Sequence, residues 1–478
     1  MTARCSTVVV GGGISGLSVA WWLQREGIDT ILLEKELQVG GTMRSVEQDG
    51  WLMEHGPNSA LETTTLFSRI FDELGISHER VYANPSSKKR YILRGGQLHA
   101  LPMSLGSFIG SPLWSPTAKL RLFKEPFVGR AGREESVAEF IERRLGKEFL
   151  DYGFDPFVAG IYAGDPGRLS IQAAFPDLYA LEEKYGGLIR GLINGRKERS
   201  QREDKPKSPR RMFSFTKGMQ AFPLAIARAL GKSLKVGCSI KRIIRKNTDD
   251  VVPAFTIHYE QGGEAWLLEA DSIVLSVPAY VASEIVRPFA GPLADRLDGI
   301  FYPPVGVVFF GFQQAQIKTS LDGFGFLVPG KEQRQILGTI WSSSLFPPRA
   351  PSGHVALTTF VGGSRQPEIM SYGDEQLIKA VANELRPILR IEGDPVFSRV
   401  TRWERAIPQY TLGYGRILGA VEHGERDFPG LFFCANYREG VSVGDCVKNG
   451  KKTARRVQEF LKFRIVENSR QMHQQSEA

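Results

Sequence analysis

Apolar and polar positions near the start of the chain follow two different periods in turn. Residues 7–10 form a short β-branched run that predicts a buried strand, and apolar residues at helical spacing follow from Leu17 to Leu23. A second apolar run covers residues 30–33. A strand, a helix and a second strand in this order predict a βαβ unit within a parallel sheet.

Further along the chain, helical and strand-like patterns alternate without an internal repeat. Apolar spacing predicts a helix over residues 66–74 that stops at Gly75, and the capping box of Ser136 and Glu139 predicts the start of another. A basic helix is expected at the C-terminal end. Strand patterns occur at residues 234–244, 251–259, 272–277, 305–312, 355–360 and 430–435. The mixture predicts an α/β fold.

The segment 101–128 differs in character from its surroundings. Large apolar residues lie close together there, among scattered serine, proline, lysine and arginine residues. Such a segment packs into a protein core or lies in a membrane interface, where apolar burial and attraction to anionic lipid reinforce each other. The sequence leaves both interpretations open.

The composition is that of a globular protein with a large core. Of the 478 residues, 42% are hydrophobic and 24% are charged, and at roughly 150 residues per domain the length suggests about three structural units. The longest apolar runs fall far short of the ~20 residues that a membrane-spanning helix needs. The first residues leave no room for a secretory or transit segment ahead of the first strand, so we expect an intracellular protein or one already processed.

Neither a disulfide framework nor a metal site is expected. The four cysteines lie far apart along the chain, and the seven histidines form no set with ligand spacing. We therefore expect reduced thiols, no bound metal and no nucleophilic triad. His55, which precedes a Gly-Pro-Asn sequence, is expected to have a structural role.

The net charge of +9 is concentrated in one stretch. Residues 196–211 contain eight basic and three acidic residues, a surplus of five positive charges. A run of this kind is typical of a solvated loop, and attraction to anionic lipid headgroups is the functional alternative. Nucleic acid is not expected as a partner, because no aromatic residues interleave with the basic ones.

A glycine-rich turn joins the first predicted strand to the first predicted helix. Gly11, Gly13 and Gly16 have the G-x-G-x-x-G spacing, and Glu34 ends the next strand. In dinucleotide-binding βαβ units the glycines permit a tight turn and close approach to the pyrophosphate, while the acidic residue accepts hydrogen bonds from the ribose. The sequence therefore predicts a nucleotide site, but this motif alone does not choose between nicotinamide and flavin.

Three further segments indicate flavin rather than nicotinamide, because they resemble segments of flavin-binding proteins. Residues 39–45, with Gly40 and Gly41, resemble the segment that wraps the FAD pyrophosphate in flavin amine-oxidase-like proteins. Residues 430–436 and 440–445 look like the C-terminal flavin segment of the same superfamily. The resemblance implies that the two ends of the chain meet at one FAD molecule.

Other segments narrow the resemblance to one family. Nearly the whole chain is similar to the oxygen-dependent protoporphyrinogen oxidase family, and coproporphyrinogen III oxidases share several of the same motifs. The segments that carry the likeness are residues 155–166, 321–329, 345–351, 359–365 and 406–410.

The resemblance implies an α/β fold with three parts. A Rossmann-like FAD-binding domain of the amine-oxidase type would combine residues 1–84, 212–285 and 420–466. A mixed-sheet substrate domain would cover 286–419, and an inserted, mostly helical, membrane-associating domain would cover 85–195. The basic loop 196–211 and a tail at 467–478 complete the expected organisation.

The resemblance also implies a set of site residues. FAD would be held by Gly11, Gly13, Ile14, Ser15, Gly16, Glu34, Lys35, Gly40, Gly41, Thr42, Arg44, Gly56, Pro57, Asn58, Ile240, Trp403, Asn436, Ser442 and Val443. The substrate would be bound by Arg90, Ala163, Gly164, Leu327, Ile340 and Phe360. In this set Leu327 and Ile340 would pack on one ring face, Phe360 would stack on the other, and Arg90 would pair with a propionate. Ala163 stands where some relatives have glycine. Without the resemblance, the apolar members would be sheet core and Arg90 a surface residue.

The activity implied is oxidation of protoporphyrinogen IX by FAD, with dioxygen as the acceptor, at a membrane surface. The flavin carries this chemistry, so no catalytic side chain is expected. We expect the protein to be cytoplasmic and peripherally bound to the inner face of a membrane, and the resemblance leaves room for a homodimer. The alternatives are a coproporphyrinogen III oxidase, an amine oxidase or carotenoid desaturase on the same fold, and a flavin-free interaction protein.

Overall fold

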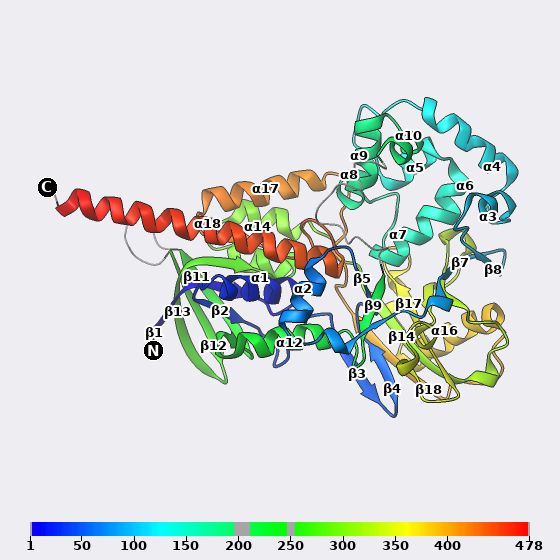
Figure 1. Ribbon diagram of the computed structural model, residues 1–478, viewed down its shortest axis with the longest axis horizontal. Helices are drawn as coiled ribbons and strands as arrows, with labels where there is room; N and C mark the ends of the chain where they lie inside the picture. The colour runs from blue at the N-terminus through cyan, green and yellow to red at the C-terminus, as the bar shows by residue number, and fades with distance from the viewer. Residues whose placement is uncertain (1, 196–210, 246–253, 477–478) are drawn as a thin grey trace.

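The structure is a computed structural model that describes residues 2–195, 211–245 and 254–476, with side chains as far as Arg464. The predicted basic loop 196–211 therefore lies outside the described residues, apart from Arg211. Figure 1 shows two sheet regions side by side and a group of helices above the second one. The C-terminal helix runs across the first sheet region and extends beyond it (Figure 1).

The first sheet has seven strands and contains the predicted βαβ unit. Its order is β10-β2-β1-β13-β12-β11, with β19 paired to β13. Strands β10, β2, β1, β13 and β19 are parallel, whereas β11, β12 and β13 form an antiparallel meander. The bounds are β1 Thr2–Val10, β2 Thr30–Leu33, β10 Leu234–Lys235, β11 Cys238–Arg245, β12 Phe255–Gln261, β13 Glu264–Leu275 and β19 Leu431–Phe433.

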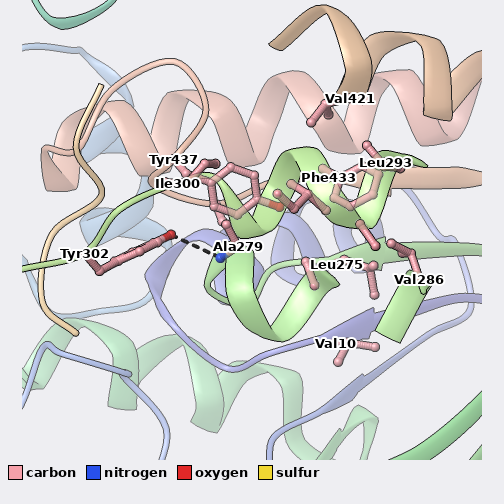
Figure 2. Packing of buried hydrophobic residues seen from close by; sticks show 14 of the residues in the cluster. Val10, Leu275, Ala279, Val286, Leu293, Ile300, Tyr302, Val421, Phe433 and Tyr437 are labelled. Atoms are coloured by element: carbon pink, nitrogen blue, oxygen red, sulfur yellow. Dashed lines mark hydrogen bonds between the residues drawn. The ribbon is translucent and has the colours of Figure 1, made fainter. Parts of the chain in front are cut away.

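Helices cover both faces of this sheet. On one face, α1 packs against α18 and α12, and their apolar side chains share a core with Val9 and Leu32. On the other face, α13, α14 and α17 pack over Val10, Leu275 and Phe433, as Figure 2 shows. The helices are α1 Ile14–Arg25, α12 Ala221–Leu230, α13 Ala279–Val286, α14 Gly291–Asp298, α17 Tyr414–Asp427 and α18 Val443–Ser476. Burial on both faces explains why β1 and β2 are continuous apolar runs.

The second sheet also has seven strands and is mixed. Its order is β18-β14-β17-β16-β15-β7-β8, and only the β15–β7 pair is parallel among them. Helix α16 (Asp374–Leu389) covers one face, with Leu377, Val381 and Leu385 fully buried against it. The strands are β7 Lys89–Arg94, β8 Gln97–Ala100, β14 Val305–Gln313, β15 Gly323–Leu327, β16 Ile336–Ile340, β17 His354–Gly362 and β18 Phe397–Trp403.

A group of short helices lies between β8 and β9. It is held by a buried ion cluster, in which the Arg144 guanidinium bonds the carboxylates of Glu125 and Glu182. The helices are α3 Leu105–Gly110, α4 Pro116–Arg121, α5 Val137–Arg144, α6 Lys147–Phe149, α7 Asp155–Tyr162, α8 Ile171–Ala174, α9 Pro176–Tyr185 and α10 Leu188–Asn194. The predicted Ser136–Glu139 capping box is present at the start of α5.

Part of the segment 101–128 packs into a core, and part of it is exposed at the surface. Leu113 and Trp114 are buried in a small core with Phe149. Six other large apolar side chains are at least 63% exposed: Met103, Leu105, Ile109, Leu120, Phe123 and Phe127. No helix among the described residues has the length and apolar character needed to cross a membrane.

Smaller elements complete the fold, and several predicted bounds are wrong in detail: the predicted strand 234–244, for example, is two strands, β10 and β11. The remaining elements are α2 Leu66–Glu73, α15 Ser342–Leu345, β3 Ser45–Gln48, β4 Trp51–Glu54, β5 Ala60–Leu61, β6 Arg80–Tyr82 and β9 Met212–Phe215. Strand β1 begins at Thr2 rather than near Thr7, because residues 2–5 pair with β13. Strand β13 begins earlier than the predicted 272–277, because residues 264–270 pair with β12. The predicted α/β class is confirmed, and the domain boundaries stay predictions.

Candidate active site

The glycine turn between β1 and α1 is closed so tightly that side chains are excluded. A Cβ on Gly16 would lie 2.0 Å from the carbonyl oxygen of Gly11, and Gly11 itself has a φ of +105°. The turn therefore needs glycine at both positions. It brings the N-terminus of α1 to the carboxyl end of the parallel strands, which is the usual ligand edge of such sheets.

Gly13 is different, because nothing in the protein fills the space beside it. A Cβ there would meet no atom within 4 Å, and the backbone has an ordinary extended conformation, with φ −70° and ψ 171°. Gly13 pairs with Gly40 in an isolated parallel bridge, and a Cβ on Gly41 would lie 3.4 Å from the Gly13 Cα. The two predicted glycine segments are thus adjacent.

Glu34 stands at the end of β2 and turns back toward the glycine turn. Its carboxylate accepts hydrogen bonds from the Gly12 and Glu36 backbone N–H groups. The Cys238 N–H donates to the carbonyl of Glu34 at 2.8 Å, which brings the start of β11, and hence Ile240, to the same end of the sheet. Lys35 is exposed next to Glu34.

The two chain ends meet through helices α1 and α18. The Ser18 hydroxyl donates to the carbonyl of Val447 at 3.2 Å, and Gly450 packs against Ser15 and Ser18. Cys446 lies beside the Ser15 side chain, and Gly450, one turn further along α18, packs on Ser18, one turn further along α1, so the two helices run in the same direction. Their N-termini, at Ile14 and Val443, therefore lie at the same edge, where two sets of backbone N–H groups and two positive dipole ends favour an anion.

A third segment approaches from the second sheet. The indole N–H of Trp403, at the end of β18, donates to the carbonyl of His55 at 2.7 Å, and the His55 N–H donates to the carbonyl of Arg44. Asn58 donates to the carbonyl of Gly56 at 3.3 Å. These bonds join Trp403 to the predicted flavin residues Arg44, Gly56, Pro57 and Asn58.

Two buried nitrogen atoms in this segment have no partner in the described structure. They are Nε of Arg44 and Nε2 of His55. Burial, the Arg399 guanidinium and the Arg44 guanidinium lower the pKa of His55, so its imidazole is neutral near pH 7. Buried polar groups are normally hydrogen-bonded, so these atoms suit a polar ligand.

The residues present therefore fit a dinucleotide such as FAD. Gly13 leaves open space at the convergence of two helix N-termini, Glu34 is placed for a ribose, and Arg44 and His55 offer free nitrogen atoms. Asn436 and Ser442 lie in the turn that leads from β19 to α18. Thr42 is exposed beside Gly41, and its contact with a cofactor stays a prediction.

The predicted substrate residues share one face of the second sheet. Leu327, Gly338 and Phe360 are directly paired across β15, β16 and β17. Ile340 is two residues beyond Gly338 on the same strand, so it points to the same side. Leu327, Ile340 and Phe360 are only partly buried, whereas Phe326 on the reverse side is 2% exposed. We call Leu327, Ile340 and Phe360 the apolar face.

Helix α7 borders the apolar face. A Cβ on Gly160 would lie 2.9 Å from Cδ2 of Leu327, so α7 approaches β15 through a glycine. Ala163 ends α7 in the left-handed region, with φ 48°, and its carbonyl accepts from the Ser364 N–H at 2.7 Å. Ala163 packs in a small core that Phe360 contacts, and Gly164 follows it. The apolar face, Ala163 and Gly164 therefore belong to one neighbourhood.

Arg90 lies at the edge of this neighbourhood, on β7. Ile92, two residues on, pairs with Leu327, and the Arg90 guanidinium lies 5.4 Å from the ring centroid of Phe324. Lys89 forms an ion pair with Asp322 at 2.6 Å, whereas Arg90 makes no ion pair within the described part of the chain. Arg90 is thus exposed and free to bind a carboxylate.

Sequence reasoning missed three residues that shape the site. Gly160 and Gly338 both lie against Leu327, and Ile92 on β7 is the strand partner of Leu327. The strand register around Leu327 is not readable from periodicity, because the β15–β7 pair and the β16–β17 pair each contain an irregularity. Among the described residues, no group of three or more His, Cys, Asp or Glu side chains is placed to hold a metal ion.

Comparison with known proteins agrees with this geometry. The family model of the flavin containing amine oxidoreductases matches residues 14–458. The chain belongs to this family. It is 36% identical to the chloroplastic protoporphyrinogen oxidase of Nicotiana tabacum, over 96% of this chain and 86% of that protein, and so belongs to the protoporphyrinogen oxidase group within the family.

More distant relatives share the fold over almost the full length. The coproporphyrinogen III oxidase of Bacillus subtilis is 27% identical over 93% of this chain and 96% of its own. A crystal structure of an Exiguobacterium sp. 255-15 protein, provisionally named a protoporphyrinogen oxidase, superposes with a TM-score of 0.78 at 23% identity, covering 95% of this chain and 98% of its own. The protein is an FAD-dependent oxidoreductase, and the predicted cofactor is confirmed.

Proposed function

We propose that this enzyme oxidises protoporphyrinogen IX to protoporphyrin IX, with dioxygen as the electron acceptor. The observation that carries the proposal is the apolar face, which is bordered by the unpaired Arg90. Gln409 and Tyr410 join the neighbourhood of this face to the turn at Asn436 in the dinucleotide site. A wide apolar macrocycle with carboxylates at one edge requires this combination of surfaces.

The protein residues would position the substrate and exclude water. The macrocycle would lie against Leu327, Ile340 and Phe360, and the Arg90 guanidinium would hold a propionate through charge-assisted hydrogen bonds. Bound FAD supplies the chemistry, accepting two electrons at a time from the substrate. The full reaction removes six electrons and six protons from the porphyrinogen, and three molecules of dioxygen take them up as three of hydrogen peroxide.

The charges around the apolar face favour protoporphyrinogen over coproporphyrinogen III. The first has two carboxylates and the second has four. Three other basic residues near the face are already paired: Lys89 with Asp322, Arg94 with Glu148 and Arg365 with Asp155. An edge with few free cations suits the substrate that has fewer carboxylates, because an unpaired carboxylate would lose hydration without compensation.

Two other activities are the alternatives. The relatives include coproporphyrinogen III oxidases at 27% identity, and solved structures with the same fold include putrescine oxidase, at a TM-score of 0.67 and 15% identity. The likeness to putrescine oxidase, at 15% identity, supports a shared fold and nothing more. Amine oxidation therefore has weaker support than oxidation of a porphyrinogen.

Steady-state kinetics with both porphyrinogens and an amine test the proposal. We expect kcat/KM to be highest for protoporphyrinogen IX, with three molecules of hydrogen peroxide formed per porphyrin. A higher kcat/KM for coproporphyrinogen III would reassign the substrate. Turnover of putrescine with no porphyrinogen oxidation would reject the proposal.

We also propose that the helical group binds a membrane surface peripherally. Its six exposed apolar side chains, from Met103 to Phe127, are accompanied by Lys119, Arg121 and Lys124. Apolar insertion and attraction to anionic headgroups would act together on such a surface. A hydrophobic porphyrinogen could then reach the enzyme from the membrane.

A further inference from the structure

Two tyrosines hold the turn between β19 and α18 from outside, and Tyr410 bonds it at two points. The Tyr410 hydroxyl donates to the carbonyl of Asn436 at 2.6 Å and accepts from the Gly440 N–H at 3.0 Å. One oxygen atom therefore closes both ends of the turn. Tyr410 is 3% exposed, so these bonds are sheltered from water.

The turn needs such support because its backbone is strained. Glu439 has a φ of +62°, which is unusual for a residue with a side chain, and Gly440 has a φ of +116°. Residues in such conformations persist only where the surroundings hold them. The Asn449 amide assists by donating to the carbonyls of Arg438 and Glu439, from the first turns of α18.

The Tyr410 ring is itself held in place by neighbouring aromatic residues. It stacks on Tyr414, with ring centroids 4.5 Å apart, and lies 5.8 Å from the ring of Tyr162. The Tyr414 hydroxyl donates to the carbonyl of Tyr437 at 2.6 Å, inside the same turn. Burial, with Tyr162 nearby, raises the pKa of Tyr410, so its hydroxyl keeps its proton and can donate.

The residue before Tyr410 makes the corresponding contact on the substrate side. The Gln409 amide donates to the carbonyl of Tyr162 at 2.8 Å, immediately before Ala163 and Gly164. The Gln409 N–H donates to the carbonyl of Phe301 at 2.9 Å. The dipeptide Gln409–Tyr410 thus joins the end of α7 to the turn that contains Asn436.

We propose that Tyr410 is a positioning residue that holds the turn 436–440 in the conformation required for FAD. It does not touch the cofactor; it acts through the backbone of Asn436 and Gly440, and so through Ser442 and Val443 beyond them. Without its hydroxyl, binding of FAD must also order the turn, and that cost weakens the affinity. The inference rests on FAD as the cofactor, not on the identity of the substrate.

The test uses Tyr410→Phe, which removes the hydroxyl and keeps the ring. In the apoprotein, amide hydrogen exchange at residues 436–440 should become faster. The FAD dissociation constant, measured by quenching of flavin fluorescence, should rise about tenfold, since two neutral hydrogen bonds are worth roughly that factor. Tyr162→Phe is the matched control: it removes a buried hydroxyl that donates to the carbonyl of Ala174 from a ring in the same cluster.

Each outcome decides the proposal. Faster exchange and weaker FAD binding in Tyr410→Phe, with Tyr162→Phe like wild type, support it. Unchanged FAD affinity in Tyr410→Phe, or an equal loss in both variants, overturns it. If Tyr410→Phe does not fold, Tyr414→Phe replaces it, with a few-fold weaker FAD binding expected and an unchanged dissociation constant contradicting the proposal. Because no porphyrinogen is used, a wrong substrate assignment would leave these results unaffected.

Discussion

The hydroxyl of Ser18 donates to the carbonyl of Val447 at 3.2 Å, although 429 residues separate them. This bond fixes the first helix of the chain against the last, with both N-termini at one edge of the first sheet. The anion site therefore depends on both ends of the polypeptide. The first βαβ unit alone would supply only one of the two helix N-termini that form this site.

Gly13→Ala should weaken FAD binding without unfolding the protein. The new methyl group meets no protein atom within 4 Å, but it would occupy the space left for the cofactor. We expect the FAD dissociation constant to rise at least about tenfold, while the apoprotein Tm changes by no more than about 3 °C.

Gly373→Ala is the matched control for this change. Gly373 also precedes a helix, has φ −63° and ψ 162°, and has open space around it, but it lies at the start of α16. Both variants place alanine at a helix N-cap, so they should share any loss of stability. Equal FAD affinity in the two variants would show that Gly13 does not face the cofactor.

Arg90→Ala should raise KM for protoporphyrinogen much more than it changes flavin content. The loss of one charge-assisted carboxylate contact corresponds to roughly a 10- to 150-fold effect. Lys88→Ala, an exposed neighbour outside β7, is the control and should behave like wild type. Steady-state kinetics on flavin-loaded enzyme check this, and an unchanged KM in Arg90→Ala would remove Arg90 from the site.

The nucleotide half of the site could be predicted from sequence because its geometry is local. Gly11, Gly13 and Gly16 lie within one turn, and the strand ending at Glu34 follows directly. The substrate half is assembled by pairing between β7, β15, β16 and β17, where irregular register decides which side chains share a face. Family resemblance assigned Leu327 and Phe360 to opposite faces of the macrocycle, whereas strand pairing puts both side chains on one face of the sheet. Gly160 and Gly338 were missed.

The segment 101–128 shows a second limit of sequence reasoning. Leu113 and Phe123 are similar apolar residues ten positions apart, yet Leu113 is fully buried and Phe123 is 73% exposed. Short helices and a 3-10 turn change direction within this segment, so no single period separates inner from outer residues. Only the three-dimensional structure shows which of these apolar side chains are buried and which are exposed.

Replacing Phe123 and Phe127 by serine should weaken binding to anionic vesicles. Both side chains are more than 70% exposed, so their loss should leave the fold and the FAD content unchanged. Flotation with vesicles containing phosphatidylglycerol measures the effect. The expected result is wild-type protein at the top of the gradient and the variant largely at the bottom. Wild-type protein that stays at the bottom would contradict membrane binding by this surface.

Arg144→Met should strongly destabilise the helical group. Glu125 and Glu182 would keep their buried carboxylates without the guanidinium that joins them, and breaking a buried ion pair costs about 3–5 kcal/mol. Arg133→Met, which removes an exposed partner of Glu139, is the control and should leave the stability almost unchanged. Urea unfolding measures both, and equal losses would contradict this description of the cluster.

The same cluster predicts a dependence of stability on pH. Burial alone would raise the pKa of Glu182, but hydrogen bonds from Arg143 and Arg144 lower it below the ordinary value of 4.5. A carboxyl with a lowered folded pKa contributes stability above its unfolded pKa and loses it as the pH falls through the folded value. Wild-type stability should therefore decline as the pH falls below about 4.5. In Arg144→Met, Glu182 loses one of the two guanidinium groups that lower its pKa, so the decline in this pH range should be smaller. Urea midpoints between pH 3 and 7 that shift equally in both proteins would oppose this.

The central claim is that FAD in this protein takes electrons directly from protoporphyrinogen. Mixing the flavin-loaded enzyme with protoporphyrinogen IX in the absence of oxygen, in a stopped-flow spectrophotometer, tests it most directly. The account predicts rapid bleaching of the flavin absorbance near 450 nm, a much slower bleaching at the same substrate concentration in Arg90→Ala, and recovery of the colour when oxygen is admitted. A flavin that stays oxidised in the presence of protoporphyrinogen would contradict it.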